Sequence, residues 1–303
     1  SAIAVDRNAY VLRVLPGAEV GAPAHVRLLG AGYFELNNRI TTAEPGRLNI
    51  IADQRGDGPR MTLRVSGSIP VDVRGVSYRR RIENPLPWVG YVFAEALRAQ
   101  GIRVGDGVSV GDTPSGAALL ASTESDQVAT LIHALGKWSD NFVAEMLFKV
   151  MGAERHRPGR AEDAVAAVRA ELEEAGIGLE GVEIVNGSGL FDGNQIAPQR
   201  IAEILRAAWN DPAIRGEYVS SLAVGGVDGT LRRRLRDLPA PRVVRAKTGT
   251  LAGVIALSGY VLGPEPGSAY AFSFLANDVR GRHGPARGLA DQIATALARH
   301  LHR

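Results

Sequence analysis

The chain has 303 residues, of which 45% are hydrophobic and 22% are charged. This length is enough for two domains with their own cores, and the composition excludes extended disorder. A net charge of +3 is too small to indicate nucleic-acid binding. The absence of cysteine excludes disulfides, cysteine-ligated zinc and a thiol nucleophile. The longest nearly apolar run, 251–263, is too short to span a bilayer.

The first part of the chain, residues 1–82, is predicted to be rich in β-structure. Apolar residues alternate with others before the Pro16-Gly17 turn, and similar short segments follow. The short spacing predicts antiparallel strands at 10–14, 25–29, 34–40, 48–52 and 61–65. The period becomes helical near Glu83, so we expect a domain boundary there and domains at 1–82 and 83–303.

The second part of the chain is predicted to contain helices, then three strands, then a terminal helix. Helical patterns end at Gly101, Gly136 and Gly176, and a further helix begins near Pro198. The later signal predicts strands at 242–250, 254–261 and 270–277, and a closing helix that carries Leu289, Ile293, Leu297 and Leu301. This order of elements indicates an α+β protein.

The first polar motif is Ser139-Asp140-Asn141, which lies between two predicted helices. These residue types are the preferred N-caps of helices, so capping alone could explain the triplet. The helix that follows is predicted to bury Phe142, Met146 and Val150.

The second polar motif is Lys247-Thr248-Gly249-Thr250, on the first of the three C-terminal strands. A lysine on a buried strand is unusual, and a glycine in a strand often marks a close approach by a ligand or another backbone. The alternative is an edge-strand lysine that discourages aggregation.

Together, in this order, the two motifs resemble those of the penicillin-recognising serine enzymes. The chain is similar to the low-molecular-mass class C penicillin-binding proteins, which are serine D-Ala-D-Ala carboxypeptidases and endopeptidases. Three further blocks, 186–190, 226–231 and 245–251, support a resemblance that covers nearly the whole chain.

The resemblance implies a β-lactamase/DD-peptidase-like α+β fold. This fold has an antiparallel sheet flanked by helices, a helical subdomain and a β-rich accessory region. Residues 1–82 would be the C-terminal part of an inserted β-rich domain. Residues 83–303 would be the C-terminal portion of the catalytic domain.

The resemblance also implies an acyl-enzyme mechanism on peptidoglycan stem peptides that end in D-Ala-D-Ala, with β-lactams as further ligands. Ser139 would relay a proton between the nucleophile's base and the leaving nitrogen. Asn141 would hold the substrate amide and the lysine that partners the nucleophile, and Lys247 would attract the terminal carboxylate. No metal, cofactor or nucleic acid is implied, and the expected location is periplasmic or extracytoplasmic.

The substrate-binding residues implied by the resemblance are Thr248, Gly249, Thr250 and Leu190. Thr248 would donate a hydrogen bond to the carboxylate, and the backbone amide of Thr250 would form half of an oxyanion hole. After Leu190 this chain has Phe191-Asp192 where many family members have Ser-Arg, so contacts with the stem peptide would differ.

The family also uses a Ser-x-x-Lys motif, in which the lysine lies one helical turn from the serine nucleophile. The chain has three lysines, and the residues three positions before them are Ala134, Met146 and Val244. We therefore expect either a fragment of a longer enzyme or a silent relative, with a fragment fitting better. The first residues also lack the pattern of a signal peptide. We expect the chain alone to be poorly stable, because its sheet would have an uncovered edge.

Several other functions have less support in the sequence. The chain contains no Gly-x-Ser-x-Gly elbow, which a Ser-His-Asp hydrolase would need, and no His-Glu-x-x-His motif, which a metalloprotease would need. Lys137 lacks the context of a nucleotide-binding loop, and Asp228 is interpreted as a turn-stabilising residue. The strongest alternative is a non-catalytic peptidoglycan- or partner-binding module on the same fold, followed by a β-lactamase.

Overall fold

The computed structural model describes residues 3–56, 58–105, 107–191 and 193–303, which divide into two compact units, up to Ala121 and from Ser122. The division falls in the coil after helix α1 (Pro85–Ala99), and not at the change of pattern near residue 82. The reason is that α1 belongs to the first unit. Its Trp88 is fully buried, and the indole ring lies 5.7 Å from the ring of Tyr33.

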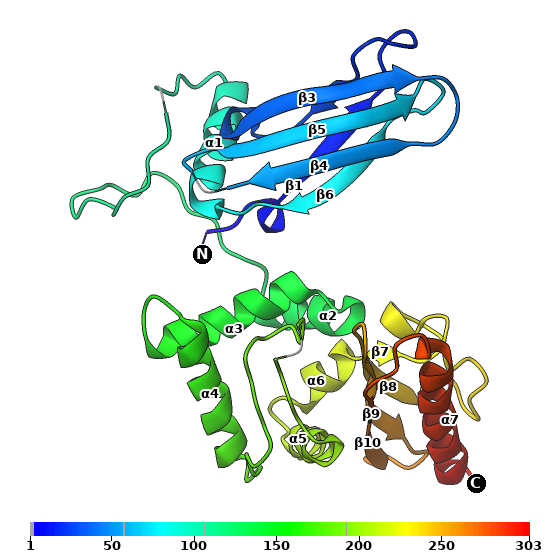
Figure 1. Cartoon of the computed structure of the whole chain (residues 1–303). Coiled ribbons are helices and arrows are strands. Elements are labelled where there is room, and N and C mark those ends of the chain that lie inside the picture. Colours follow the sequence, from blue (N-terminus) through cyan, green and yellow to red (C-terminus); the bar gives the residue numbers. More distant parts are fainter. Residues whose placement is uncertain (1–2, 57, 106, 192) are drawn as a thin grey trace. The chain divides into compact units, whose positions relative to one another are not determined.

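The first unit contains two three-stranded sheets that share one core (Figure 1). The strand orders are β2-β1-β6 and β3-β5-β4. Alternate residues of the central strands, such as Leu12 and Leu63, are fully buried because successive side chains point to opposite faces of a strand. The elements are η1 (Asp6–Asn8), β1 (Ala9–Leu15), β2 (His25–Arg27), η2 (Ala31–Tyr33), β3 (Phe34–Ala43), β4 (Asn49–Arg55), β5 (Met61–Pro70) and β6 (Val76–Arg81).

The prediction that all strands of this unit are antiparallel is wrong for one pair. Strands β3 and β5 run parallel, because β4 lies on the far side of β5 and does not pair with β3. Alternation along one strand does not encode which strand will be its neighbour. Strand β6, which carries Arg79, Arg80 and Arg81, was not among the expected segments.

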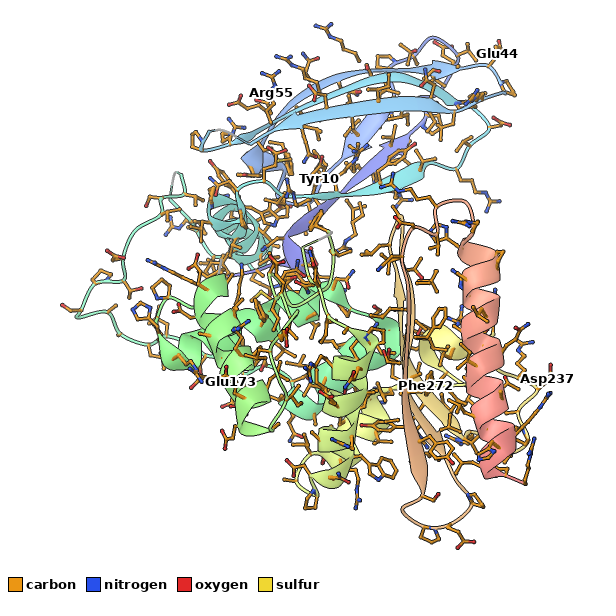
Figure 2. The ribbon with its side chains drawn as sticks, turned by 60° about the horizontal axis from the view of Figure 1, so that its bottom comes forward. Tyr10, Glu44, Arg55, Glu173, Asp237 and Phe272 are labelled. Carbon is orange, nitrogen blue, oxygen red and sulfur yellow. The ribbon has the colours of Figure 1, made fainter. Side chains whose placement is uncertain are left out.

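The second unit contains an antiparallel sheet with helices on both faces (Figure 1). On one face the small residues Ala290, Ala294 and Ala298 of α7 allow that helix to pack closely on the strands. Phe272 of β10 lies on this side (Figure 2). On the other face α5 and α6 cover Tyr260. The sheet has the order β10-β9-β8-β7, with β7 (Ala223–Val224), β8 (Val244–Thr250), β9 (Ile255–Leu262) and β10 (Ala269–Ala276).

The remaining helices of this unit form a helical part beside the sheet (Figure 1). They include α2, α3 and α4, and α3 packs closely on α4 at Gly152, where an added Cβ would lie 2.8 Å from the Arg160 carbonyl oxygen. The bounds are α2 (Val128–Trp138), α3 (Asn141–Arg155), α4 (Ala161–Glu174), α5 (Pro198–Asn210), α6 (Arg215–Ser221), η3 (Gly229–Leu231) and α7 (His283–Leu301).

The α+β class, the three C-terminal strands and the terminal helix are confirmed. The helix expected to stop at Gly136 instead continues to Trp138. Gly136 is not a stop signal, because it is the point where α2 touches the backbone of Ser221. The predicted buried face of α3 is also wrong. Ala144 and Phe148 are buried there, since the contacts with α4 and the 186–190 loop decide which face is covered.

In the described ranges, none of the helices is both long and apolar enough to cross a membrane. The same residues contain no group of three or more histidine or carboxylate side chains that could hold a metal ion.

Candidate active site

Ser139 lies in the tight connection between α2 and α3. Its backbone has φ 58 and ψ 51, the left-handed region that non-glycine residues rarely adopt. Such backbone strain concentrates at functional sites, where surrounding structure holds it in place. The capping interpretation holds for the neighbour Asp140, whose carboxylate accepts a hydrogen bond from the Val143 amide at 3.3 Å. The side chain of Ser139 therefore remains free for another contact.

That contact is with Lys247 on β8. The Lys247 Nζ donates to the Ser139 Oγ at 2.8 Å and to the Thr248 carbonyl oxygen at 2.7 Å. The two predicted motifs, far apart in sequence, thus meet through one hydrogen bond. Burial lowers the pKa of Lys247 to about 8, because desolvation penalises the charged ammonium.

Among the described residues, the stretch of β8 that carries the second motif is paired with a strand on one side only, which leaves a free edge. Strand β7 pairs with β8 only through Ala223 with Ala246 and Val224 with Arg245, whereas β9 pairs with β8 as far as Thr250. Residues 247–250 of β8 therefore pair with β9 but not with β7. An extended peptide can add to such an edge through main-chain hydrogen bonds. Lys247 thus lies at a strand edge, as the alternative interpretation of this lysine predicted. Its contact with Ser139 shows that it also joins the two motifs.

Thr248 belongs to a pair of hydroxyl groups beside Lys247. Its Oγ1 donates to the Oγ1 of Thr230 at 2.9 Å. Thr230 lies on η3 and was not predicted as a site residue. Its membership in the 226–231 block, which supported the family resemblance, was the available signal.

Gly249 and Thr250 complete the strand. A Cβ on Gly249 would lie 3.0 Å from the Cβ of Ala256, so the contact with β9 itself already favours glycine here. Thr250 pairs with Ile255 and is exposed at the end of β8.

Asn141 is the first residue of α3, and its side chain is half-buried. In the part of the chain that the structure describes, it makes no hydrogen bond with another side chain, so its amide is free to bind a ligand.

Leu190 lies on a loop that is fastened to α3. The amide of Ser188 donates to the Glu145 carboxylate at 2.9 Å, and the Asn186 side-chain amide donates to the Leu190 carbonyl oxygen at 2.9 Å. Among the described residues, no hydrogen bond joins this loop to Ser139 or Lys247. Leu190 is 38% exposed, and Asp192, part of the expected difference in stem-peptide contacts, lies outside the described residues.

The hydrogen-bonded group of Ser139, Lys247, Thr248 and Thr230 presents one ammonium and several hydroxyls beside a free strand edge. This arrangement can bind a carboxylate by charge and hydrogen bonds, and it can pass a proton through the serine hydroxyl.

The fold is that of the penicillin-binding proteins. The structure matches penicillin-binding protein 4 of Haemophilus influenzae, solved in complex with a β-lactam, with a TM-score of 0.76 and 22% sequence identity. The match covers 98% of this chain and 70% of that chain. A second structure of the same protein gives a TM-score of 0.74.

The sequence identifies the family. The chain belongs to the D-Ala-D-Ala carboxypeptidase 3 (S13) family, whose profile matches residues 1–299. It is 37% identical to a D-alanyl-D-alanine carboxypeptidase of an Actinomadura species, over 97% of this chain and 55% of that protein. It is 30% identical to the carboxypeptidase DacB of Mycolicibacterium smegmatis, over 72% of this chain and 47% of that protein. The chain thus spans about half the length of these curated relatives.

Proposed function

We propose that this chain is part of a serine D-Ala-D-Ala carboxypeptidase that acts on peptidoglycan stem peptides through an acyl-enzyme and is acylated by penicillins. The observation that carries the proposal is the 2.8 Å hydrogen bond from Lys247 to Ser139, which joins the two motifs in one site. Because peptidoglycan lies outside the cytoplasm, the proposal also places the protein there.

In this proposal the C-terminal carboxylate of the substrate binds Lys247 and Thr248. The ammonium supplies charge and the hydroxyl supplies a directed hydrogen bond, a combination suited to a carboxylate. The peptide lies along the free edge at 247–250, with the amide of Thr250 at the oxyanion. Asn141 holds the scissile amide region, and Leu190 contributes an apolar contact to the stem peptide.

Ser139 would serve as a proton relay. Its hydroxyl accepts a hydrogen bond from Lys247 and can donate toward the leaving nitrogen. The proton that the nucleophile's base has taken up would pass through this hydroxyl to the departing D-Ala, while Lys247 keeps its charge. The left-handed backbone of Ser139 orients the hydroxyl for that purpose.

The nucleophile would lie outside the 303 residues, since none of the three lysines follows a serine by three positions. The sheet offers a place for additional structure, because β10 is an end strand in the order β10-β9-β8-β7. We propose that the segment with the nucleophile completes the sheet there, and that the unit rich in β-structure is an accessory region of the same enzyme.

The first test is the intact mass of the protein purified from its source cells, with and without benzylpenicillin. We expect one covalent drug adduct per molecule, and a much slower gain of adduct when Lys247 is replaced by Ala, because the carboxylate of the drug loses its cation. A protein that folds and never gains an adduct would contradict the proposal.

The second candidate is a non-catalytic peptidoglycan- or partner-binding module. The missing Ser-x-x-Lys motif favours it. Such a protein would bind a peptide ending in D-Ala-D-Ala reversibly, and Lys247→Ala would weaken that binding, but no covalent adduct would form.

A further inference from the structure

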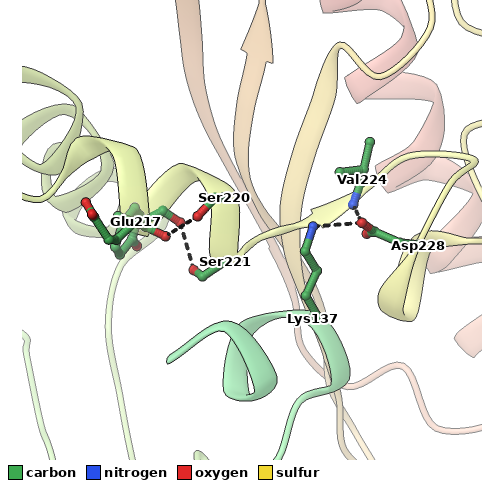
Figure 3. Close-up of polar contacts among 7 residues, drawn as sticks. Lys137, Glu217, Ser220, Ser221, Val224 and Asp228 are labelled. Atoms are coloured by element: carbon green, nitrogen blue, oxygen red, sulfur yellow. Dashed lines mark hydrogen bonds and ion pairs between the residues drawn. The ribbon is translucent and has the colours of Figure 1, made fainter. Parts of the chain in front are cut away.

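An ion pair between a buried lysine and a partly exposed aspartate lies beside the candidate site and has no place in the proposed mechanism. The Lys137 Nζ on α2 contacts the Asp228 Oδ2 at 2.8 Å (Figure 3). The side chain of Lys137 is only 6% exposed. The other carboxylate oxygen of Asp228 accepts from the Val224 amide at 2.7 Å. One carboxylate oxygen therefore joins the segment after β7 to α2, and the other fixes the turn that leads from β7 to Asp228.

This pair connects the two segments that carry the polar groups of the site. Lys137 stands two residues before Ser139, and Asp228 stands two residues before Thr230. Thr230 accepts from Thr248, and Lys247 donates to Ser139. The ion pair, the two hydrogen bonds and the short stretches of chain between them form a closed ring.

Backbone packing supports the same connection. Gly229 has φ 54, and a Cβ there would collide with the carbonyl oxygen of Lys137. The turn of η3 thus lies directly against the last turn of α2. The unusual backbone of Ser139 comes directly after this turn and needs surrounding contacts to hold it.

The lowered pKa of Asp228 favours the ionised carboxylate that the contact with Lys137 requires. Burial raises the pKa of Asp228, but hydrogen bonds from Lys137 and from the Val224 amide lower it more, with a smaller contribution from Arg245, so the pKa stays below its ordinary value. Asp228 is thus more than the turn-stabilising residue expected from its sequence context.

We propose that Lys137 and Asp228 are positioning residues, which hold Ser139 and Thr230 in register with Lys247 and Thr248. This inference deepens the proposed function and rests on it. A displacement of about 1 Å in a reacting group can lower a rate by about 100-fold. Removal of the pair would therefore slow acylation by more than the accompanying loss of stability explains.

The test uses the natural full-length protein with Lys137→Met, Asp228→Asn and the double variant. Each single variant leaves one partner unpaired and should lower the melting temperature. The double variant removes both charges, and the asparagine oxygen can still accept from the Val224 amide, so most of the melting temperature should return. We expect its benzylpenicillin acylation rate to remain about 10- to 100-fold below that of the parent protein.

The matched control is Arg200→Met. It removes a 2.8 Å ion pair with Glu203 on α5, an element that holds none of the proposed site residues. We expect this variant to keep the parent acylation rate. A double variant that regains both its melting temperature and its acylation rate would show a purely structural pair and would overturn the inference.

A second readout does not depend on activity. The ¹³Cε signal of Lys247 in selectively labelled protein, assigned with the lysine variants, reports its titration. We expect the pKa of Lys247 to rise in the double variant, because displacement of Ser139 opens its surroundings to water. If the parent protein gains no penicillin adduct, the proposed function fails, and an unchanged titration would then overturn the inference separately.

Discussion

Lys247 has two properties that act against each other at the candidate site. In the proposed function its ammonium must be charged to attract a carboxylate, yet burial favours the neutral amine and lowers the pKa to about 8. The contacts with Ser139 and the Thr248 carbonyl oxygen orient the group for an incoming ligand. The charge of this single side chain therefore depends on pH within a range that kinetic experiments can reach.

At the residue scale, we predict a basic limb in the acylation rate of the natural protein. Above a pH of about 8 the free Lys247 loses its proton, so the second-order rate constant for benzylpenicillin should fall. Lys247→Arg keeps its charge, so any remaining activity should lack this limb. The check is to measure these rates from about pH 6 to about pH 10, roughly two units on each side of this pKa. The same basic limb in both proteins would contradict the assignment to Lys247.

The same residue also contributes to the pH dependence of stability. A lysine whose folded pKa is lowered binds fewer protons in the folded state than in the unfolded state. Its unfavourable contribution is fully present below the folded pKa and disappears as the pH rises toward the unfolded value. We predict that Lys247→Met gains melting temperature over the parent at pH 7 and that this gain shrinks toward pH 10.5. A gain independent of pH would contradict this account.

Thr230 provides a second prediction at the residue scale. Thr230→Val keeps the shape of the side chain but removes the oxygen that accepts from Thr248 at 2.9 Å. The Thr248 hydroxyl is then free to rotate, so we expect acylation by benzylpenicillin to slow by about tenfold, the effect of losing one oriented hydrogen bond. Thr230→Ser, which retains the oxygen, is the control and should stay near the parent rate. Equal effects of valine and serine would point to packing instead.

At the element scale, one sheet of the first unit carries like charges on its outer face. Strands β2, β1 and β6 contain no aspartate or glutamate. The register places Arg13 of β1 directly opposite Arg27 of β2, and Arg79 opposite Val11 on the same face. On the other sheet the register pairs Asp53 with Arg64. Like charges directly opposite each other destabilise a sheet.

We therefore predict that Arg27→Glu stabilises the first unit by about 0.2–1 kcal/mol, because repulsion from Arg13 becomes attraction. Arg27→Gln removes the repulsion without adding attraction and should fall between the parent and the glutamate variant. Urea unfolding in low salt measures the order, and added salt should reduce the differences. A glutamate variant less stable than the glutamine variant would contradict the prediction.

At the scale of the whole molecule, the two compact units differ in how their sheets are buried. In the first unit both sheets and α1 share one buried core. In the second, β10 stands at the end of its sheet, with α5 on one face and α7 on the other. An unpaired edge strand with an apolar neighbourhood is a liability for an isolated domain.

We predict that residues 1–121 expressed alone melt cooperatively, whereas residues 122–303 expressed alone melt broadly or aggregate. Calorimetry on the two pieces and on the 303-residue chain measures this, and the chain should show one sharp transition from the first unit. A cooperative, high-temperature transition of 122–303 would contradict the proposal that an additional segment completes its sheet.

The sequence by itself determined the α+β class, the three C-terminal strands and the two motifs around Ser139 and Lys247. Periodicity and residue type are local properties, and they can be read along the chain. Only the tertiary structure decided that β3 and β5 are parallel, that α1 belongs to the first unit and that Thr230 joins the site. These features depend on contacts between residues far apart in sequence, which local patterns do not encode. The ion pair of Lys137 and Asp228 is of the same kind, since neither residue alone indicates its partner.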